Sequence, residues 1–271
     1  VSMKGGFQAW KNKGLPVQED RQFTSEQQIR YSRHFLLPEV GEAGQAKLLD
    51  AKVLCIGAGG LGSPVALYLA SAGVGNITLV DDDQIDLTNL QRQIPHTTAR
   101  VGQSKAASGK QTLAGINPEV NVIALQERAD EARLQSLVAD ASVVLDCTDN
   151  FATRHAINRS CVAAGVPLVS GAAIRMDGQV AVFDPRSGET ACYACLFPPD
   201  QQFEEVACST MGVFAPLVGI IGTLQAAEAL KLVAGVGQSL ADRLLLLDAR
   251  RMDWTSIRTK RSTDCAVCGK K

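Results

Sequence analysis

The stretch Lys52-Val-Leu-Cys-Ile-Gly-Ala-Gly-Gly-Leu-Gly62 predicts a buried β-strand that runs directly into a glycine-rich turn. A helix rich in small residues is expected over residues 61–72, and a second strand over residues 76–80 leads into Asp81-Asp-Asp83. Strand, glycine turn, helix, strand and acid in this order are typical of the first unit of a doubly wound sheet. This stretch therefore indicates the fold class.

Segments further along the chain continue the alternation of helix and strand. Helices are expected over residues 104–117, 130–139 and 151–164, and strands over residues 120–125, 142–145 and 167–170. The alternation predicts an α/β fold with a Rossmann-like, doubly wound, mostly parallel sheet and helices on both faces. After Gly171 a turn at Met176-Asp-Gly178 and a strand over residues 179–183 indicate an antiparallel C-terminal portion. A helix over residues 219–233 and a strand over residues 244–247 complete it.

The start of the chain differs from the rest. Residues 1–20 have the character of a loop, whereas Thr24-Ser-Glu-Gln27 fits a capping box that begins a new unit. A short helix around residues 43–49 then leads to the glycine turn. We therefore divide the chain into a leading segment, residues 1–20, and one domain, residues 21–271.

Composition narrows the class of protein. The 271 residues carry a net charge of −1, so nothing indicates a basic face for nucleic acid. Pro216, Glu228 and Lys231 interrupt the most apolar stretch, and we expect no membrane helix. Eight cysteines without a secretory signal pattern fit a reducing cytoplasm better than a disulfide framework. Three of these cysteines are expected to be core thiols: Cys55, Cys147 and Cys161.

Two paired cysteine turns predict a metal centre. Cys192 and Cys195 form one Cys-x-x-Cys pair, and Cys265 and Cys268 form another. Two such turns supply the four sulfurs that tetrahedral zinc requires, and four thiolates leave no position for a water. The alternatives are two unrelated pairs or a redox motif, but a thioredoxin-like motif needs only one pair. We therefore predict a structural zinc site.

The glycine turn is expected to hold phosphates. Glycines let the backbone approach an anion, and the following helix offers free N–H groups. Gly57, Gly59 and Gly62 also fit the dinucleotide fingerprint, and Asp81 stands where an acid could hold a ribose hydroxyl. On this motif alone, NAD is a reasonable prediction, and the residues just downstream discriminate.

Polar residues downstream favour a triphosphate. Asn89 and Arg92 follow the second strand, and Lys105 begins the next helix, near the same strand ends. Hydride transfer needs no clustered cations there, whereas a triphosphate must have its charge offset before a carboxylate can attack it. Asp146 and Asp149 end the fourth strand, and Asp149 is a candidate magnesium ligand. The alternative is that Arg92 and Lys105 are solvated and that Asp149 caps the next helix.

Taken together, these residues resemble the MoeB/ThiF family of adenylyltransferases, which are relatives of the ubiquitin-activating enzymes. The matching segments are RYSRHFLLPEVG, VLCIGAGGLGSPVALYLASAGVG, DDDQIDLTNLQRQ, VGQSK, LDCTDN, VPLVSGAAIRMDGQV, CYAC, MGVFAPLVGIIG and CAVC. They span nearly the whole chain, from Thr24 to Gly269. Within the family, the molybdopterin branch is the one that the chain resembles most.

The resemblance implies a specific reaction. Members of the family use ATP and Mg²⁺ to attach AMP to the C-terminal glycine carboxylate of a small ubiquitin-like sulfur-carrier protein, and they release pyrophosphate. The acyl-adenylate then reacts with a sulfur donor, a rhodanese or a cysteine desulfurase, to give a thiocarboxylate. For the molybdopterin branch the carrier is the small subunit of molybdopterin synthase, and the pathway is that of the molybdenum cofactor. The thiamine-pathway carrier is the alternative.

The resemblance also assigns residues. It places Gly60 and Asp81 at the nucleotide, with Asp81 on the ribose, and it brings Asn89, Arg92 and Lys105 to ATP. Asp149 and Asn150 would serve magnesium and the phosphates. Arg33 would reach the triphosphate of the other subunit, which implies a homodimer. The four paired cysteines would hold zinc.

Two further segments carry weaker resemblances. Cys208 lies in a polar loop where relatives use a cysteine for a covalent link or a sulfur relay to the carrier, although neighbouring Glu204 and Glu205 would raise the pKa of its thiol. Residues 5–17 are similar to the end of a rhodanese domain. The leading segment is thus either a linker or the remnant of a longer rhodanese fusion.

Two rival functions remain beside the adenylyltransferase. A nicotinamide-dependent dehydrogenase would use the same glycine turn, but it leaves Asn89, Arg92 and Lys105 unexplained. A catalytically silent relative that only docks a ubiquitin-like protein would have lost an ATP residue, and none is missing from the pattern. The presence of only three histidines is consistent with a reaction that needs no general base.

Overall fold

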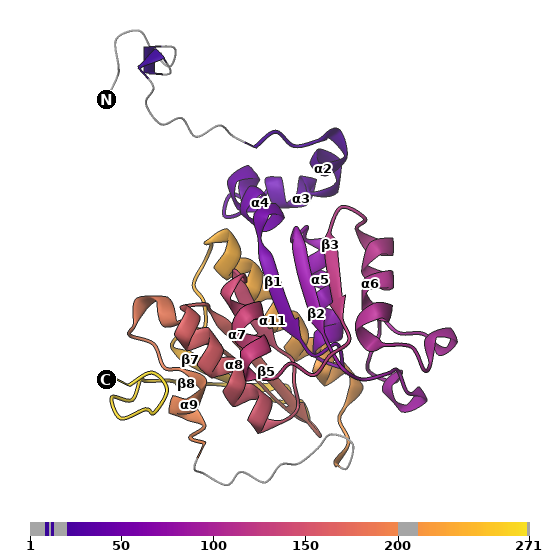
Figure 1. The fold of residues 1–271 in the computed structure, drawn as a ribbon, viewed down its shortest axis with the longest axis vertical. Coiled ribbons are helices and arrows are strands. Elements are labelled where there is room, and N and C mark those ends of the chain that lie inside the picture. Colours follow the sequence, from indigo (N-terminus) through magenta and orange to yellow (C-terminus); the bar gives the residue numbers. More distant parts are fainter. Residues whose placement is uncertain (1–8, 11, 14–20, 200–210, 270–271) are drawn as a thin grey trace.

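The computed structural model describes residues 9–10, 12–13, 21–199 and 211–269 of the chain, and one mixed sheet organises it (Figure 1). The strands lie in the order β3-β2-β1-β4-β5-β6-β7-β8. Their bounds are β1 (Lys52–Ile56), β2 (Asn76–Val80), β3 (Asn121–Leu125), β4 (Val143–Asp146), β5 (Leu168–Ile174), β6 (Asp177–Phe183), β7 (Arg243–Asp248) and β8 (Asp253–Arg258). The predicted α/β doubly wound fold is confirmed.

The parallel half of the sheet sets the position of the ligand site. From β1 the chain winds outward to β2 and β3, and it then returns to place β4 on the other side of β1. The strand order therefore reverses between β1 and β4, and open α/β sheets bind ligands beyond the carboxyl ends of the strands at such a point. The glycine turn follows β1 at this edge, and Cys147 follows β4.

Helices cover both faces of the sheet. The helices are α2 (Ser25–Arg30), α3 (Ser32–Phe35), α4 (Gly41–Asp50), α5 (Gly62–Ser71), α6 (Lys105–Ile116), α7 (Glu131–Ala139), α8 (Phe151–Ala164), α9 (Tyr193–Leu196) and α11 (Ala215–Ala234). Alternate residues of a strand face opposite sides. Val53 and Cys55 accordingly join the core beneath α5, α6 and α11, whereas Leu54 and Ile56 join the core beneath α7 and α8. Cys55, Cys147 and Cys161 are buried core thiols, as predicted.

One helix corrects a sequence expectation. By length and composition α11 is apolar enough to cross a membrane, so the expectation that no segment would meet this threshold is wrong. A helix that is apolar on most of its circumference is also what the core of a large α/β domain requires. Half of the most apolar window of α11 is buried inside the protein, against α5 and the sheet. Its buried Gln225 and Glu228 bond to backbone groups, as befits a core helix.

The antiparallel portion is longer than predicted. β5 continues to Ile174, which pairs with Asp177, so the hairpin turn is Arg175-Met176 and not Met176-Asp-Gly178. Gly178 belongs to β6, where a Cβ would lie 2.8 Å from the Ile221 side chain of α11. Gly178 is therefore required by the close packing of α11 on β6, and the turn predicted at this glycine is wrong. It also missed β8, an edge strand whose residues are all exposed and lack an apolar pattern.

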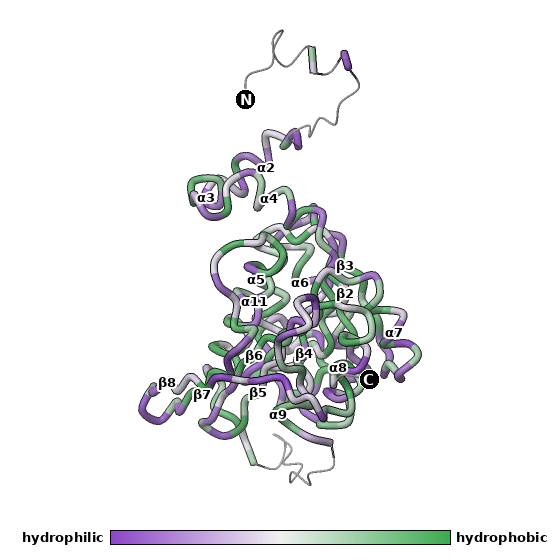
Figure 2. The backbone as a smooth tube through the Cα atoms, turned by 90° about the vertical axis from the view of Figure 1, so that its left-hand side faces the viewer, coloured by the Kyte–Doolittle hydropathy of each residue, from purple (hydrophilic) through white to green (hydrophobic). Residues whose placement is uncertain are grey.

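The N-terminal helices lie at the opposite end of the molecule from α9 (Figure 2). Thr24 and Gln27 form the predicted capping box of α2. Tyr31 anchors this region, because its buried ring packs on Gly73 and its hydroxyl accepts a bond from Asn117 Nδ2 at 2.9 Å. Further upstream, Ala9, Trp10 and Asn12 are helical where a loop was expected.

Candidate active site and metal centre

A cavity of about 1020 Å³ opens at the carboxyl ends of β1 and β4. Most of the residues predicted to bind nucleotide line it: Gly57, Gly59, Gly60, Asp81, Asn89, Arg92, Lys105, Asp149 and Asn150. Gly62 and Arg33 are not among the described lining residues. The fold therefore brings together polar groups that are spread over more than 90 residues of sequence.

The glycine turn is shaped by close backbone contacts. Gly57 has a φ of 98°, and a Cβ there would lie 2.7 Å from the Cys147 carbonyl oxygen, so only glycine fits. A Cβ on Gly62 would lie 1.9 Å from the Gly57 carbonyl oxygen. Gly62 thus closes the turn from behind, which explains why it does not line the cavity.

Two side chains hold the turn at Ala58. The Asp81 carboxylate accepts hydrogen bonds from the backbone N–H groups of Ala58 at 2.7 Å and Asp83 at 2.9 Å. Burial raises the pKa of Asp81, and these two hydrogen bonds oppose the rise. Behind the turn, His96 Nε2 donates to the Ala58 carbonyl oxygen at 3.2 Å, and burial lowers the pKa of His96. Asp81 therefore already supports the turn beside which a ribose would lie.

The cationic side chains are held by local contacts. Lys105 begins α6, and its ammonium, on a side chain only 8% exposed, pairs with Asp83 at 2.6 Å. Arg92 Nη1 donates to the Thr88 carbonyl oxygen at 3.1 Å. Asn89 accepts the Asp86 N–H at 3.0 Å and completes a capping box there. Both cations line the cavity and are not fully solvated, contrary to the alternative considered for them.

Asp149 lines the cavity without capping the helix that follows it. The cap of α8 is Asn150, whose Oδ1 accepts the Thr153 N–H at 2.9 Å, so the suggestion that Asp149 caps this helix is wrong. The Asp149 side chain is exposed and lines the cavity. A hard cation prefers such oxygen ligands.

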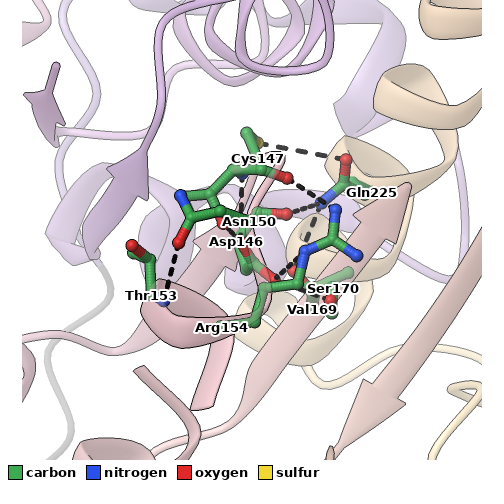
Figure 3. A network of polar contacts seen from close by, with 9 residues as sticks. Asp146, Cys147, Asn150, Thr153, Arg154, Val169, Ser170 and Gln225 are labelled. Carbon is green, nitrogen blue, oxygen red and sulfur yellow. Dashed lines mark hydrogen bonds and ion pairs between the residues drawn. The ribbon is translucent and has the colours of Figure 1, made fainter. Parts of the chain in front are cut away.

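Several polar residues that line the cavity were not predicted from the sequence, among them Gln93 and Arg154. Gln93 is 3% exposed, and its Oε1 has no hydrogen-bond partner among the described residues. Arg154 lies one helical turn after Asn150 (Figure 3), and its Nη2 donates to the Thr148 carbonyl oxygen. In the sequence, Gln93 could have been found only because it follows Arg92, and Arg154 only because it lies four residues after Asn150.

The four paired cysteines form one cluster at the end of the molecule that holds α9. Their Sγ atoms lie within 4.8 Å of one another, with separations of 3.9 Å for Cys192–Cys195, 3.7 Å for Cys192–Cys265 and 3.4 Å for Cys195–Cys268. A tetrahedron with Zn–S bonds of about 2.3 Å has edges of about 3.8 Å. The donor set therefore fits zinc, although other thiophilic metals share this geometry.

The thiols of the cluster differ in how readily they lose a proton. Burial raises the pKa of Cys192. Burial also raises the pKa of Cys265, but hydrogen bonds from the backbone of Cys268 and Val267 outweigh it and lower that pKa to about 7. Thiols must lose their protons to bind zinc, so metal binding at this cluster depends on pH.

Two remaining candidates, Cys208 and Arg33, are not among the described residues that line the cavity. Cys208 falls outside the described residues. Arg33 is exposed on α3, and α3 and α4 adjoin the amino end of β1 (Figure 1), at the edge of the sheet opposite the glycine turn. The Arg33 of one subunit is therefore not placed to serve the cavity of the same subunit.

Comparison with known proteins identifies the family. The model of the ThiF family matches residues 31–267. The sulfur carrier protein ThiS adenylyltransferase of Escherichia coli K12 is 48% identical, over 89% of this chain and 95% of the relative. The molybdopterin-synthase adenylyltransferase of the same organism is 45% identical, over 92% and 99%. Sequence identity does not single out the molybdopterin branch.

A solved structure supports the same conclusion. The crystal structure of E. coli MccB with ATP superposes with a TM-score of 0.78 at 26% identity, over 98% of this chain and 81% of that chain. The family match spans the glycine turn, the cationic residues and both cysteine pairs except Cys268. The chain therefore belongs to the ThiF family, and it is an adenylyltransferase.

Proposed function

We propose that the protein transfers AMP from ATP to the C-terminal glycine carboxylate of a small ubiquitin-like sulfur-carrier protein, and that it releases pyrophosphate. The single observation that carries the proposal is the convergence of the glycine turn, Arg92, Lys105 and Asp149 on one cavity. Relatives that cover nearly the whole chain are adenylyltransferases of sulfur carriers. A dehydrogenase would leave the cations of this cavity without a role.

The proposed roles follow from the charges of the reactants. A carboxylate attacks a polyanion poorly, so catalysis depends on positioning and on charge neutralisation. The glycine turn and the start of α5 would hold phosphate, and Arg92 and Lys105 would stabilise the charge that develops during transfer. Asp149 and Asn150 would hold Mg²⁺ and the phosphates, and Asp81 the ribose. The attacking oxygen carries no proton, so no general base is needed.

For the carrier we propose the small subunit of molybdopterin synthase, on the segments that resemble the molybdopterin branch. The second candidate is the thiamine-pathway carrier ThiS, because a relative at 48% identity is a ThiS adenylyltransferase. In either case the acyl-adenylate would pass to a sulfur donor, a rhodanese or a cysteine desulfurase. Cys208 would then be a candidate for a covalent or relay step, and residues 1–20 for the remnant of a rhodanese fusion.

ATP–pyrophosphate exchange tests the proposal directly. With Mg²⁺ present, we expect exchange only when a carrier ending in Gly-Gly is added, and exchange with the molybdopterin carrier would name the pathway. Exchange with ThiS alone would support the same adenylation reaction but would assign the protein to the thiamine pathway. A carrier whose terminal glycine is removed serves as the control. A folded protein that exchanges with neither carrier would favour the silent docking protein.

We further propose that two subunits share their sites. Ile29 of α2 is 78% exposed, Leu36 at the C-terminal cap of α3 is 71% exposed, and Arg33 lies between them in the sequence. Exposed apolar groups of this density are typical of a protein interface. A two-fold dimer through this face would carry Arg33 towards the cavity of the partner.

Mixing two inactive variants tests the shared site. We expect Arg33→Ala and Asp149→Ala each to lack exchange activity, and a mixture to recover up to about a quarter of the wild-type activity. Random re-pairing makes about half of the dimers mixed, and each two-fold mixed dimer has one complete site. Exchange is measured after subunit mixing, and Asp149→Ala mixed with itself is the control. Full activity of Arg33→Ala alone, or a mixture without recovery, would refute action in trans.

A further inference from the structure

One face of α8 connects the nucleotide cavity with the cysteine cluster. Asn150 caps the start of α8, and Arg154 and Asn158 follow at intervals of four residues, so Arg154 and Asn158 line the same side of the helix. Asn150 lines the cavity, whereas Asn158 contacts a cysteine of the cluster. Two sites that are far apart in sequence thus share one rigid element.

The cavity end of this face holds the turn that follows β4. Arg154 Nη2 donates to the Thr148 carbonyl oxygen at 2.6 Å, and Nε lies 3.8 Å from Asp146 Oδ2. Asp146 is fully buried, and it accepts bonds from the Thr148 N–H at 3.0 Å and from the Ser170 hydroxyl at 2.8 Å (Figure 3). The Asp146 carboxylate is thus occupied by hydrogen bonds within the protein that hold this turn. Arg154 and Asp146 together fix the backbone that presents Asp149.

The other end of this face holds a cysteine turn. Asn158 Oδ1 accepts the Tyr193 N–H at 2.9 Å, and Asn158 Nδ2 donates to Cys192 Sγ at 3.6 Å. Hydrogen bonds of this kind orient metal ligands and are costly to remove. The position of α8 therefore depends on how Cys192 is held.

Tyr193 lies between the two ends. It directly follows Cys192, is 1% exposed, and packs edge-on against His155 with ring centroids 5.2 Å apart. Among the described side chains, the Tyr193 hydroxyl and the Arg154 Nε are two of the few buried polar atoms without a hydrogen-bond partner. Tyr193 is therefore linked to α8 by its packing against His155 and by the hydrogen bond from its N–H to Asn158.

We propose that Arg154 is a positioning residue of the nucleotide site, and that Asn158, Tyr193 and Arg154 couple this site to metal binding at the cysteine cluster. The proposal rests on the proposed function, because it assumes that the cavity binds ATP. Metal at the cluster holds Cys192 and Tyr193, these hold α8, and α8 holds the Thr148 turn beside Asp149. Coupling between two binding sites is reciprocal, so bound nucleotide strengthens metal binding by the same factor.

Zinc affinity with and without Mg-ATP tests the coupling. Zinc affinity is measured by competition with a chromophoric chelator, in excess Mg²⁺ and without carrier, so no turnover occurs. We expect saturating Mg-ATP to tighten zinc binding about 5-fold or more in the wild-type protein, which is the lower range of known coupling factors. In Arg154→Met and in Tyr193→Phe this gain is expected to disappear.

Two comparisons make the result decisive. The matched control is Arg159→Met on the same helix, because Arg159 is exposed and pairs only with Glu131 of α7 among the described residues; its gain should equal that of the wild type. Tyr193→Phe keeps the packed ring and serves if Arg154→Met does not fold. Equal gains in wild type, Tyr193→Phe and Arg154→Met would overturn the proposal.

Calorimetric titration of the wild type with Mg-ATP distinguishes a failure of the coupling from a failure of the proposed function. A wild type that binds Mg-ATP without any gain in zinc affinity refutes the coupling and leaves the proposed function standing. A wild type that does not bind Mg-ATP refutes the proposed function itself.

Discussion

Replacing Lys105 by alanine is expected to lower ATP–pyrophosphate exchange by about 10²- to 10³-fold, which corresponds to roughly 3–4 kcal/mol of transition-state stabilisation. The Lys105 ammonium is buried in the cavity wall beside Asp83, and a charge in such a water-poor site acts more strongly on a phosphate than a solvated one. Its removal leaves Arg92 as the remaining one of the two cations proposed to stabilise the developing negative charge.

The same helix supplies the control for this experiment. Lys110 is exposed on α6 and does not line the cavity, so Lys110→Ala should exchange at the wild-type rate. Asp83 is 66% exposed, and water can solvate it when Lys105 is lost, so the unfolding temperature of Lys105→Ala should change little. An exchange rate of Lys105→Ala within a few-fold of the wild type would show that Lys105 does not contact the reacting phosphates.

Removal of zinc is expected to have the largest effect on stability. Structural zinc contributes on the order of 10 kcal/mol of apparent binding free energy, which in small metal domains is folding free energy. In this protein the cluster joins Cys192 and Cys195, around α9, to the C-terminal turn of Cys265 and Cys268. Arg261 bonds to the Cys268 and Gly188 carbonyl oxygens in the same region, but such contacts are weak by comparison.

Cys268→Ser tests this expectation with two measurements. Metal analysis should show that the variant has lost its zinc, and urea unfolding should show that the C-terminal turn separates from the body at a lower urea concentration. Cys161→Ala is the control, because Cys161 is a buried thiol of the core and not of the cluster, and it should keep its zinc. A Cys268→Ser protein that retains zinc at the wild-type ratio and unfolds as the wild type does would contradict a four-cysteine centre.

The sequence predicted those parts of the site that depend on local geometry. Lys52–Ile56 is a strand as expected because its run of apolar residues can only be buried on both faces of a sheet. The glycine turn could be predicted because close backbone approach admits no side chain at Gly57 and Gly62. The four cysteines could be paired with a metal from their spacing alone. Their actual convergence still had to come from the fold.

Local sequence patterns gave wrong predictions where the residue type is determined by packing against another helix or strand. Gly178 suggested a turn, but it is required because α11 packs against β6 at this point. β8 was missed because an exposed edge strand needs no apolar alternation and is held mainly by pairing with β7. The apolar composition of α11 was compared with that of a membrane helix, but in the fold half of its most apolar window is buried against the sheet and α5.

The sequence by itself determined the family, the order of strands and helices, and most residues that surround the proposed nucleotide site. These features follow from short-range rules of backbone conformation and from the spacing of ligands. Only the tertiary structure decided that Gly62 closes the turn from behind, that Asn150 and not Asp149 caps α8, and that Arg33 lies at the far edge of the sheet. It also packed Tyr193 of α9 against α8 beside Arg154 and Asn158, because residues about 40 positions apart come into contact only when the chain folds.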